Sequence, residues 1–372
     1  DFETLAADST DQALSGLTDG ITYYVCLIAT DAASNSANAT YNFAVDTSAP
    51  TGHSITGPAD PISSTSPTVE WNDATGETKY DLYVNAGSQD CTDTATFDFE
   101  TLAADSTDQA LSGLTDAVTY YVCLVATDGA SNSANATYNF TVDTSAPSGH
   151  SITGPADPIG STSPTVTWDD ATGETKYDLY VNAGSEDCTN GATFDFETLA
   201  ADSTDQALTG LTDAVTYYVC LVATDGASNS ANATYNFTVD TSAPSGHSIT
   251  GPADPISSTS PTVTWDDATG ETKYDLYVNA GSEDCTNGAT FDFETLAANS
   301  TDQALSGLTD GITYYVCLIA TDAAANSANA TYNFAVDTSA PTGHSITGPA
   351  DPISSTSPTV EWNDATGETK YD

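Results

Sequence analysis

The chain repeats itself at a period of 97 residues. The stretch "DFETLAADSTDQAL" begins at Asp1, and near-identical copies begin at Asp98, Asp195 and Asp292, with no insertion or deletion between them. Solenoid repeats have periods of roughly 20–50 residues, whereas a unit twice that long is the size of a small independent domain. The sequence therefore predicts an array of complete domains, each with its own hydrophobic core.

A recurring "VDTSAP" segment marks the boundaries between domains. It begins at Val45, Val142, Val239 and Val336, where Pro and small polar residues follow a strand-like run. Cutting there predicts three complete domains at 49–145, 146–242 and 243–339, half a domain at 1–48 and the first part of another at 340–372. We expect the chain to be an internal piece of a longer array, with further 97-residue units on both sides.

Within each unit the pattern is that of short strands. Runs such as "SPTVTW" and "KYDLYVNA" are rich in Val, Thr, Tyr and Trp and are bounded by Gly, Asp, Asn and Pro. In "TYYVCLIAT", Tyr23, Val25 and Leu27 fall on one face of a strand while Tyr24 and Cys26 fall on the other. About seven such strands in roughly 100 residues predict a Greek-key β-sandwich. The expected fold class is therefore all-β, an elongated array of tandem sandwiches.

Each unit resembles a fibronectin type III domain or a related bacterial immunoglobulin-like repeat. The resemblance rests on "TVEW", which ends in Trp71, on "YDLYV", and on "LTDGITYYVCLIATD" with Leu17, Gly20 and Tyr23 at the family's spacing. It implies that Tyr23 and its copies Tyr120, Tyr217 and Tyr314 are tyrosine corners, bonded through their hydroxyls to loop backbone. It also implies that Trp71, Trp168, Trp265 and Trp362 fill the cores, and that the whole protein is a large extracellular surface protein.

Seven cysteines follow the same repeat, with spacings that alternate between 65 and 32 residues. Under the linker phasing each complete domain contains one pair, which predicts the disulfides Cys91–Cys123, Cys188–Cys220 and Cys285–Cys317; the partner of Cys26 would precede residue 1. Such a bond would add roughly 3–4 kcal/mol by closing a loop in the unfolded chain, and it indicates an oxidising, extracellular compartment. Buried free thiols and disulfides between chains remain alternatives, whereas two Cys without a nearby His are too few ligands for a metal.

The chain is strongly acidic, with 53 Asp and Glu against four lysines and a formal net charge of −49. Charge repulsion excludes nucleic acid and anionic membranes as partners. No apolar run reaches the ~18–20 residues that would span a bilayer. The charge suits a soluble surface polymer, a protein adapted to high salt, or one that binds divalent cations.

Two kinds of surface site are predicted from recurring polar residues. Carboxylates at linkers and strand ends suit Ca²⁺, which takes 6–8 oxygen ligands and would stiffen the connections between domains; the alternative is that these acids only keep the surface hydrated. The candidate calcium ligands are Asp31, Asp46, Asp128, Asp143, Asp225, Asp240, Asp322 and Asp337. N-glycosylation motifs occur at Asn38, Asn135, Asn139, Asn232, Asn236 and Asn329.

No constellation of residues indicates catalysis. The four histidines occur singly, just after each linker, and no Ser, Cys or carboxylate recurs with them at a spacing typical of a catalytic triad. The sequence thus predicts a non-enzymatic, structural extracellular protein: a stalk, fibre or adhesin from a bacterium or archaeon. Its expected partners are copies of itself, neighbouring repeats and cell-surface ligands. The alternatives are a multivalent array that binds carbohydrate or protein through avidity, and the spacer of a secreted enzyme.

Overall fold

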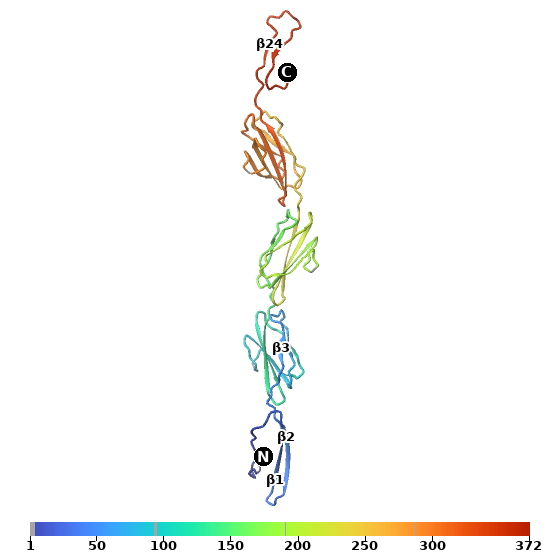
Figure 1. Cartoon of the computed structure of the whole chain (residues 1–372), viewed down its shortest axis with the longest axis vertical. Coiled ribbons are helices and arrows are strands. Elements are labelled where there is room, and N and C mark those ends of the chain that lie inside the picture. Colours follow the sequence, from blue (N-terminus) through green and yellow to red (C-terminus); the bar gives the residue numbers. More distant parts are fainter. Residues whose placement is uncertain (1–3, 93–94, 190, 287) are drawn as a thin grey trace.

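The computed structural model of the chain describes residues 4–92, 95–189, 191–286 and 288–372, and every regular element in these ranges is a β-strand. Successive units stand in one row, with the two termini at opposite ends (Figure 1). We refer to residues 49–145, 146–242 and 243–339 as the first, second and third units. No helix among the described residues is long and apolar enough to cross a membrane.

Each unit contains seven strands with closely matching bounds. The first has β3 (Ser54–Gly57), β4 (Thr68–Asn72), β5 (Lys79–Ala86), β6 (Phe97–Ala103), β7 (Asp108–Ala110), β8 (Thr119–Thr127) and β9 (Ser133–Thr141). The second has β10 (Ile152–Gly154), β11 (Thr165–Trp168), β12 (Lys176–Ala183), β13 (Phe194–Ala200), β14 (Asp205–Ala207), β15 (Thr216–Thr224) and β16 (Ser230–Thr238). The third has β17 (Ile249–Gly251), β18 (Thr262–Trp265), β19 (Lys273–Ala280), β20 (Phe291–Ala297), β21 (Asp302–Ala304), β22 (Thr313–Thr321) and β23 (Ser327–Ala335).

The two end segments contain only parts of this pattern. Residues 4–48 include β1 (Thr22–Thr30) and β2 (Ser36–Ala44), which correspond to β8 and β9 of the first unit. Residues 340–372 include β24 (Ser345–Gly348) and β25 (Glu361–Asn363), which correspond to β3 and β4. Each end segment therefore has one two-stranded sheet.

Two antiparallel sheets face each other in each complete unit. In the first unit the orders are β3-β4-β7 and β6-β5-β8-β9. The chain crosses from the three-stranded sheet to the four-stranded sheet between β4 and β5. It returns to the three-stranded sheet at β7 and crosses once more to the four-stranded sheet at β8, which is a Greek-key arrangement. The prediction of an all-β array of Greek-key sandwiches is confirmed.

The core lies between the two sheets and follows the alternation of the strands. On β8, Tyr120, Val122 and Leu124 are buried together with Trp71 of β4. Each of the three core clusters lies within a single unit. The implied core role is confirmed for Trp71, Trp168 and Trp265, each 3% exposed. It is wrong for Trp362, which is 50% exposed because no four-stranded sheet lies opposite β24 and β25.

The tyrosine corner implied by the resemblance is present in every copy. The Tyr120 hydroxyl accepts a hydrogen bond from the Thr115 backbone N–H at 3.0 Å. The hydroxyls of Tyr23, Tyr217 and Tyr314 likewise accept the backbone N–H of the residue five positions earlier. It holds the loop before β8 against the strand, so the entry of the chain into the four-stranded sheet has a fixed geometry.

A second buried tyrosine was not foreseen from the sequence. Tyr80 is 0% exposed; its hydroxyl accepts the Ala74 N–H at 2.5 Å and donates to Asp73 Oδ1 at 2.9 Å. Burial raises the pKa of Tyr80 to about 12, and the nearby Asp73 carboxylate acts in the same direction. Tyr177 and Tyr274 have equivalent bonds and the same raised pKa.

These tyrosines should make the units sensitive to alkali. The unfolded phenol ionises near pH 10 while the folded one stays protonated to about pH 12. The contribution of each tyrosine to the free energy of unfolding is therefore complete below pH 10 and is lost as the pH rises toward 12. The loss is on the order of 2 kcal/mol for each sandwich unit. Denaturant unfolding followed at pH 9 to 12 measures this loss. A Tyr80→Phe, Tyr177→Phe, Tyr274→Phe chain should be less stable at pH 9 but lose less stability above pH 10; equal losses would contradict the assignment.

Candidate functional site: the joints between units

The disulfides lie on the outer face of each four-stranded sheet and not in the core. Cys123 is on β8 between the core residues Val122 and Leu124 and points away from them; it is joined to Cys91 of the β5–β6 loop at an S–S distance of 2.01 Å. Cys188–Cys220 and Cys285–Cys317 are joined in the same way, and Cys26 is free and exposed. The bond fastens the long β5–β6 loop across the sheet.

The side-chain amide of Asn85 fastens the same loop at a second point. Its nitrogen donates to the Asp90 carbonyl at 3.2 Å, and its oxygen accepts the Thr96 N–H at 3.1 Å. Cys123 and Asn85 are consequently buried, although both face away from the core. The described part of the loop, residues 87–92 and 95–96, therefore covers this part of the outer face of the sheet.

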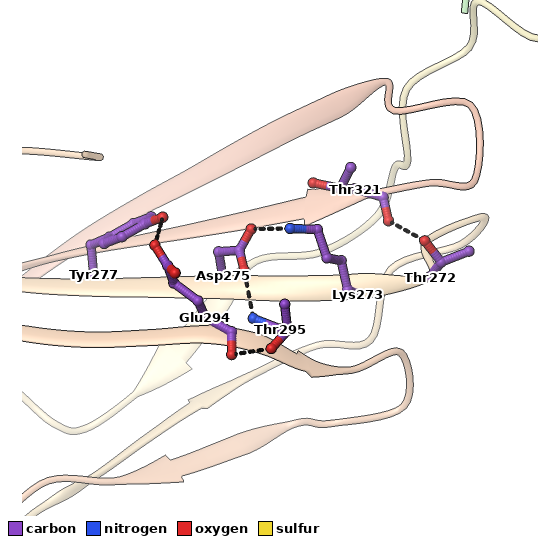
Figure 2. A network of polar contacts seen from close by, with 7 residues as sticks. All are labelled: Thr272, Lys273, Asp275, Tyr277, Glu294, Thr295 and Thr321. Atoms are coloured by element: carbon purple, nitrogen blue, oxygen red, sulfur yellow. Dashed lines mark hydrogen bonds and ion pairs between the residues drawn. The ribbon is translucent and has the colours of Figure 1, made fainter. Parts of the chain in front are cut away.

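The single lysine of each complete unit pairs with an Asp on that face, and Figure 2 shows this pair in the third unit. In the third unit the Lys273 ammonium lies 2.7 Å from Asp275 Oδ2, and Asp275 Oδ1 accepts the Thr295 N–H at 2.7 Å. Thr295 has φ 59°, a left-handed conformation that is rare for a β-branched residue, at the irregular pairing of β19 with β20. The Asp275 carboxylate thus stabilises a bulge, and the Lys273 ammonium balances its negative charge.

The joint between the first and second units is made by a loop and a linker. The loop is 225–229, between β15 and β16, where Asp225 Oδ1 accepts the Asn229 N–H and Oδ2 accepts the Asn229 side-chain amide, both at 2.8 Å. The same amide nitrogen donates to the carbonyl of Asp143, in the linker before the unit, at 2.7 Å. Equivalent bonds join Asn132 to Asp46 at 3.0 Å and Asn326 to Asp240 at 2.6 Å.

The loop also packs against the preceding unit. A methyl group placed on Gly226 would lie 3.6 Å from the Pro61 ring, in the β3–β4 connection of the first unit. Ala227 and Ala324, in the loops of the second and third units, are 6% and 8% exposed. The equivalent Ala130 is exposed, because residues 4–48 contain no strands corresponding to β3 and β4. Contact between units therefore accounts for the burial of these alanines.

A second carboxylate fixes the linker itself. Asp116 accepts the Thr144 N–H at 2.6 Å and the Ser145 hydroxyl at 2.8 Å. These bonds hold the pKa of Asp116 below its usual value, the Thr144 backbone bond contributing most. Asp19, Asp213 and Asp310 make the same pair of bonds and also have a lowered pKa. The linker is thus hydrogen-bonded to the unit before it by one Asp and to the unit after it by one Asn.

The structure gives the eight candidate calcium ligands hydrogen-bonding roles. Asp31, Asp128, Asp225 and Asp322 hold their own loops through an Asn four residues later. Asp46, Asp143, Asp240 and Asp337 accept the N–H of a Ser two residues later. Across the described ranges no three His, Cys, Asp or Glu side chains are grouped closely enough to hold a metal ion. Calcium binding stays a prediction, and it would have to compete with these bonds.

The signal for these roles was present in the sequence as the recurring Asp-x-x-x-Asn of "DAASN" and "DGASN". Asp side chains commonly bond backbone groups a few residues ahead in turns, so this pattern itself indicates carboxylates that close their own loops. The glycosylation candidates Asn38, Asn135, Asn139, Asn232, Asn236 and Asn329 are all exposed. Their modification stays a prediction.

Comparison with known proteins returns tandem fibronectin type III domains. The crystal structure of the chicken CNTN1 FN1–FN3 domains matches with a TM-score of 0.33 and 14% identity, covering 78% of this chain and 98% of that one. A two-domain fibronectin type III segment from chicken tenascin matches with a TM-score of 0.23 and 21% identity, covering 51% of this chain and 99% of that one. No protein-family model and no curated protein matches the chain. The strand order and core of the chain itself define its units as Greek-key β-sandwiches.

The joint between the second and third units leaves no room for a side chain at Gly160. A methyl group there would lie 2.6 Å from the Ala324 carbonyl oxygen and 2.8 Å from Asn326 Oδ1, whereas ordinary contact begins at 3.4 Å. Gly160→Ser should force the two units apart by several tenths of an ångström and tilt them. Small-angle scattering of the full chain should then give a smaller maximum dimension than for the unaltered chain.

The neighbouring joint supplies the control, because Ser63 occupies the equivalent place in the first unit. At that joint the loop of the second unit has Gly226 and Ser228. The corresponding residues of the third unit are Ala323 and Ala325. Adding Ala323→Gly and Ala325→Ser to the Gly160→Ser chain reproduces that combination and should restore the original dimension. Unchanged scattering from Gly160→Ser alone would show that the contact at Gly160 does not set the geometry of the joint.

Proposed function

We propose that the chain is part of a stiff extracellular rod that holds other parts of a bacterial or archaeal surface protein at a fixed distance. The observation that carries the proposal is the recurrence of one joint: the Asn amide reaches the preceding linker carbonyl at 3.0, 2.7 and 2.6 Å in successive copies. A chain of independent binding modules has no need for identical connections, whereas a rod depends on every connection being the same.

The disulfides support an extracellular location, because such bonds persist in oxidising compartments. They also support a load-bearing role. Each bond joins β8, or its equivalent, to a loop 32 residues earlier in sequence, so the enclosed segment cannot be extended when the chain is pulled from its ends. The net charge of −49 favours an extended, soluble array, since neighbouring units repel one another.

Removing the joint hydrogen bond tests the rod. Asn132→Ala, Asn229→Ala and Asn326→Ala together should make the joints flexible, because each loses roughly 1 kcal/mol of hydrogen bonding at a small contact. Small-angle scattering should show a shorter mean end-to-end distance and a broader distance distribution. The matched control changes the exposed Asn139, Asn236 and Asn333 to Ala and should scatter as the original. Identical curves for both variants would overturn the proposal.

Reduction should lengthen the chain under force. When a unit unfolds with its disulfide intact, the 32-residue separation between the cysteines stays closed. Reduction releases it and should add about 110 Å to each unfolding step, at ~3.3–3.6 Å per extended residue. Single-molecule pulling with and without dithiothreitol measures the step. A Cys188→Ser, Cys220→Ser chain should show one long step and two short ones without reductant; three equal steps would contradict the load-bearing assignment.

A further inference from the structure

β9 is an open edge of the four-stranded sheet, which has the order β6-β5-β8-β9. At its end, the Thr141 carbonyl accepts the Ile62 N–H and the Thr141 N–H donates to Asp60 Oδ1, both at 2.9 Å. These Thr141 groups point away from β8. Because backbone groups on a strand alternate in direction, those of Ser133, Asn135, Thr137 and Asn139 point the same way. β9 therefore presents a row of donors and acceptors along its outer side.

The other edges of the unit are protected against pairing with another strand. β6 carries Asp98 and Glu100, and Thr101 at φ 57° interrupts its regular pairing with β5. Charges and bulges of this kind prevent edge-to-edge association. β3 and β7 are only four and three residues long. β9 has neither protection: its sequence, "SANATYNFT", has no charge and no Pro, and it pairs with β8 over nine consecutive residues.

We propose that β9 is a lateral interaction surface that pairs, antiparallel, with β9 of a second copy of this chain. The choice of partner follows from charge. A chain with a net charge of −49 repels its own copies over most of its surface, so two copies can meet closely only where both are uncharged. β9 and the half-buried Tyr121 and Val125 beside it on β8 form such a strip. A cationic partner would instead be attracted to the acidic parts of the surface.

Twofold symmetry fixes how the two strands meet, because an isologous contact uses the same residues twice. The longest pairing of the open part of β9 places Asn135 opposite Thr137 of the copy, and Ser133 opposite Asn139 of the copy. Ala136 then lies opposite its own counterpart, where a small side chain lets the strands approach. β2, β16 and β23 have the same register with β1, β15 and β22 and offer the same edge. This inference concerns association between chains and does not depend on the stiffness of the joints.

The pairing should depend strongly on salt. Repulsion between two anionic chains acts over a Debye length of about 30 Å at 0.01 M salt but only about 3 Å at 1 M. Backbone hydrogen bonds across the edge are much less sensitive to ionic strength. We therefore expect monomers at low salt and laterally paired chains at high salt.

Sedimentation equilibrium of the full 372-residue chain in 10 mM and 1 M NaCl tests the proposal. At low salt the mass should be 38.2 kDa, and at high salt it should rise with protein concentration toward twice that value. A chain with Thr40→Asp, Thr137→Asp, Thr234→Asp and Thr331→Asp, all at exposed edge positions, should remain monomeric at 1 M NaCl. The control with Thr10→Asp, Thr107→Asp, Thr204→Asp and Thr301→Asp, also exposed, has the same net charge and should pair like the original.

Three results would overturn the proposal: a monomeric original chain at 1 M NaCl and millimolar concentration, pairing of the edge variant, or loss of pairing in the control as well. The last would mean that association depends on total charge and not on β9. Melting curves of both variants should lie close to that of the original chain. This measurement distinguishes a variant that cannot pair through β9 from one that no longer folds. Scattering at low salt measures the monomer alone, so a flexible monomer would contradict the rod without bearing on the edge.

Discussion

The hydrogen bond between the Asn229 side chain and the Asp143 carbonyl joins two units through the backbone of the segment that separates them. A linker of six residues would otherwise leave its carbonyls to water and its dihedral angles free. Here the Asn is itself held by Asp225, whose loop is closed by the pairing of β15 with β16. The position of one unit is therefore transmitted to the next through a short series of bonds, each anchored in a sheet.

The high negative charge of the chain has a structural use that composition alone does not reveal. Asp116 and Asp128 accept backbone N–H groups in the linker and in a loop, so these carboxylates replace the main-chain partners that irregular segments lack. Asp81 does the same for the strained Thr101 while paired with the unit's single lysine. Hydrogen bonds to an ionised carboxylate are stronger than those between neutral groups. The acids at these positions thus fix the linker, a loop and a bulge of each unit.

The sequence predicted what depends on local pattern and period. Alternating residues in the recurring "TYYVCL" segment separated the two faces of β8, and the family spacing placed the tyrosine corner at Tyr120. The sequence did not predict the joint, because Asn229 and Asp143 are 86 residues apart and neither residue type favours such a contact. It also did not predict the second buried tyrosine, Tyr80, or the left-handed Thr101. The conformations of Tyr80 and Thr101 depend on the register of β5 with its neighbouring strand and on its contact with a loop. This register is set only in the folded sheet.

Copies of one domain in tandem repeat the same joint. A rod made of dissimilar joints would change direction at each one, whereas copies of one domain give the same rotation each time. One of the differences between copies lies at a joint: Gly160 precedes the joint to the loop that carries Ala323, while the equivalent Ser63 precedes the joint to the loop that carries Gly226. The second and third units therefore lack a side chain on one side of their joint and have an added methyl group on the other. The bond from the Asn side chain to the preceding linker carbonyl is nevertheless kept at each joint, at 3.0, 2.7 and 2.6 Å, so the joint tolerates this exchange of small residues.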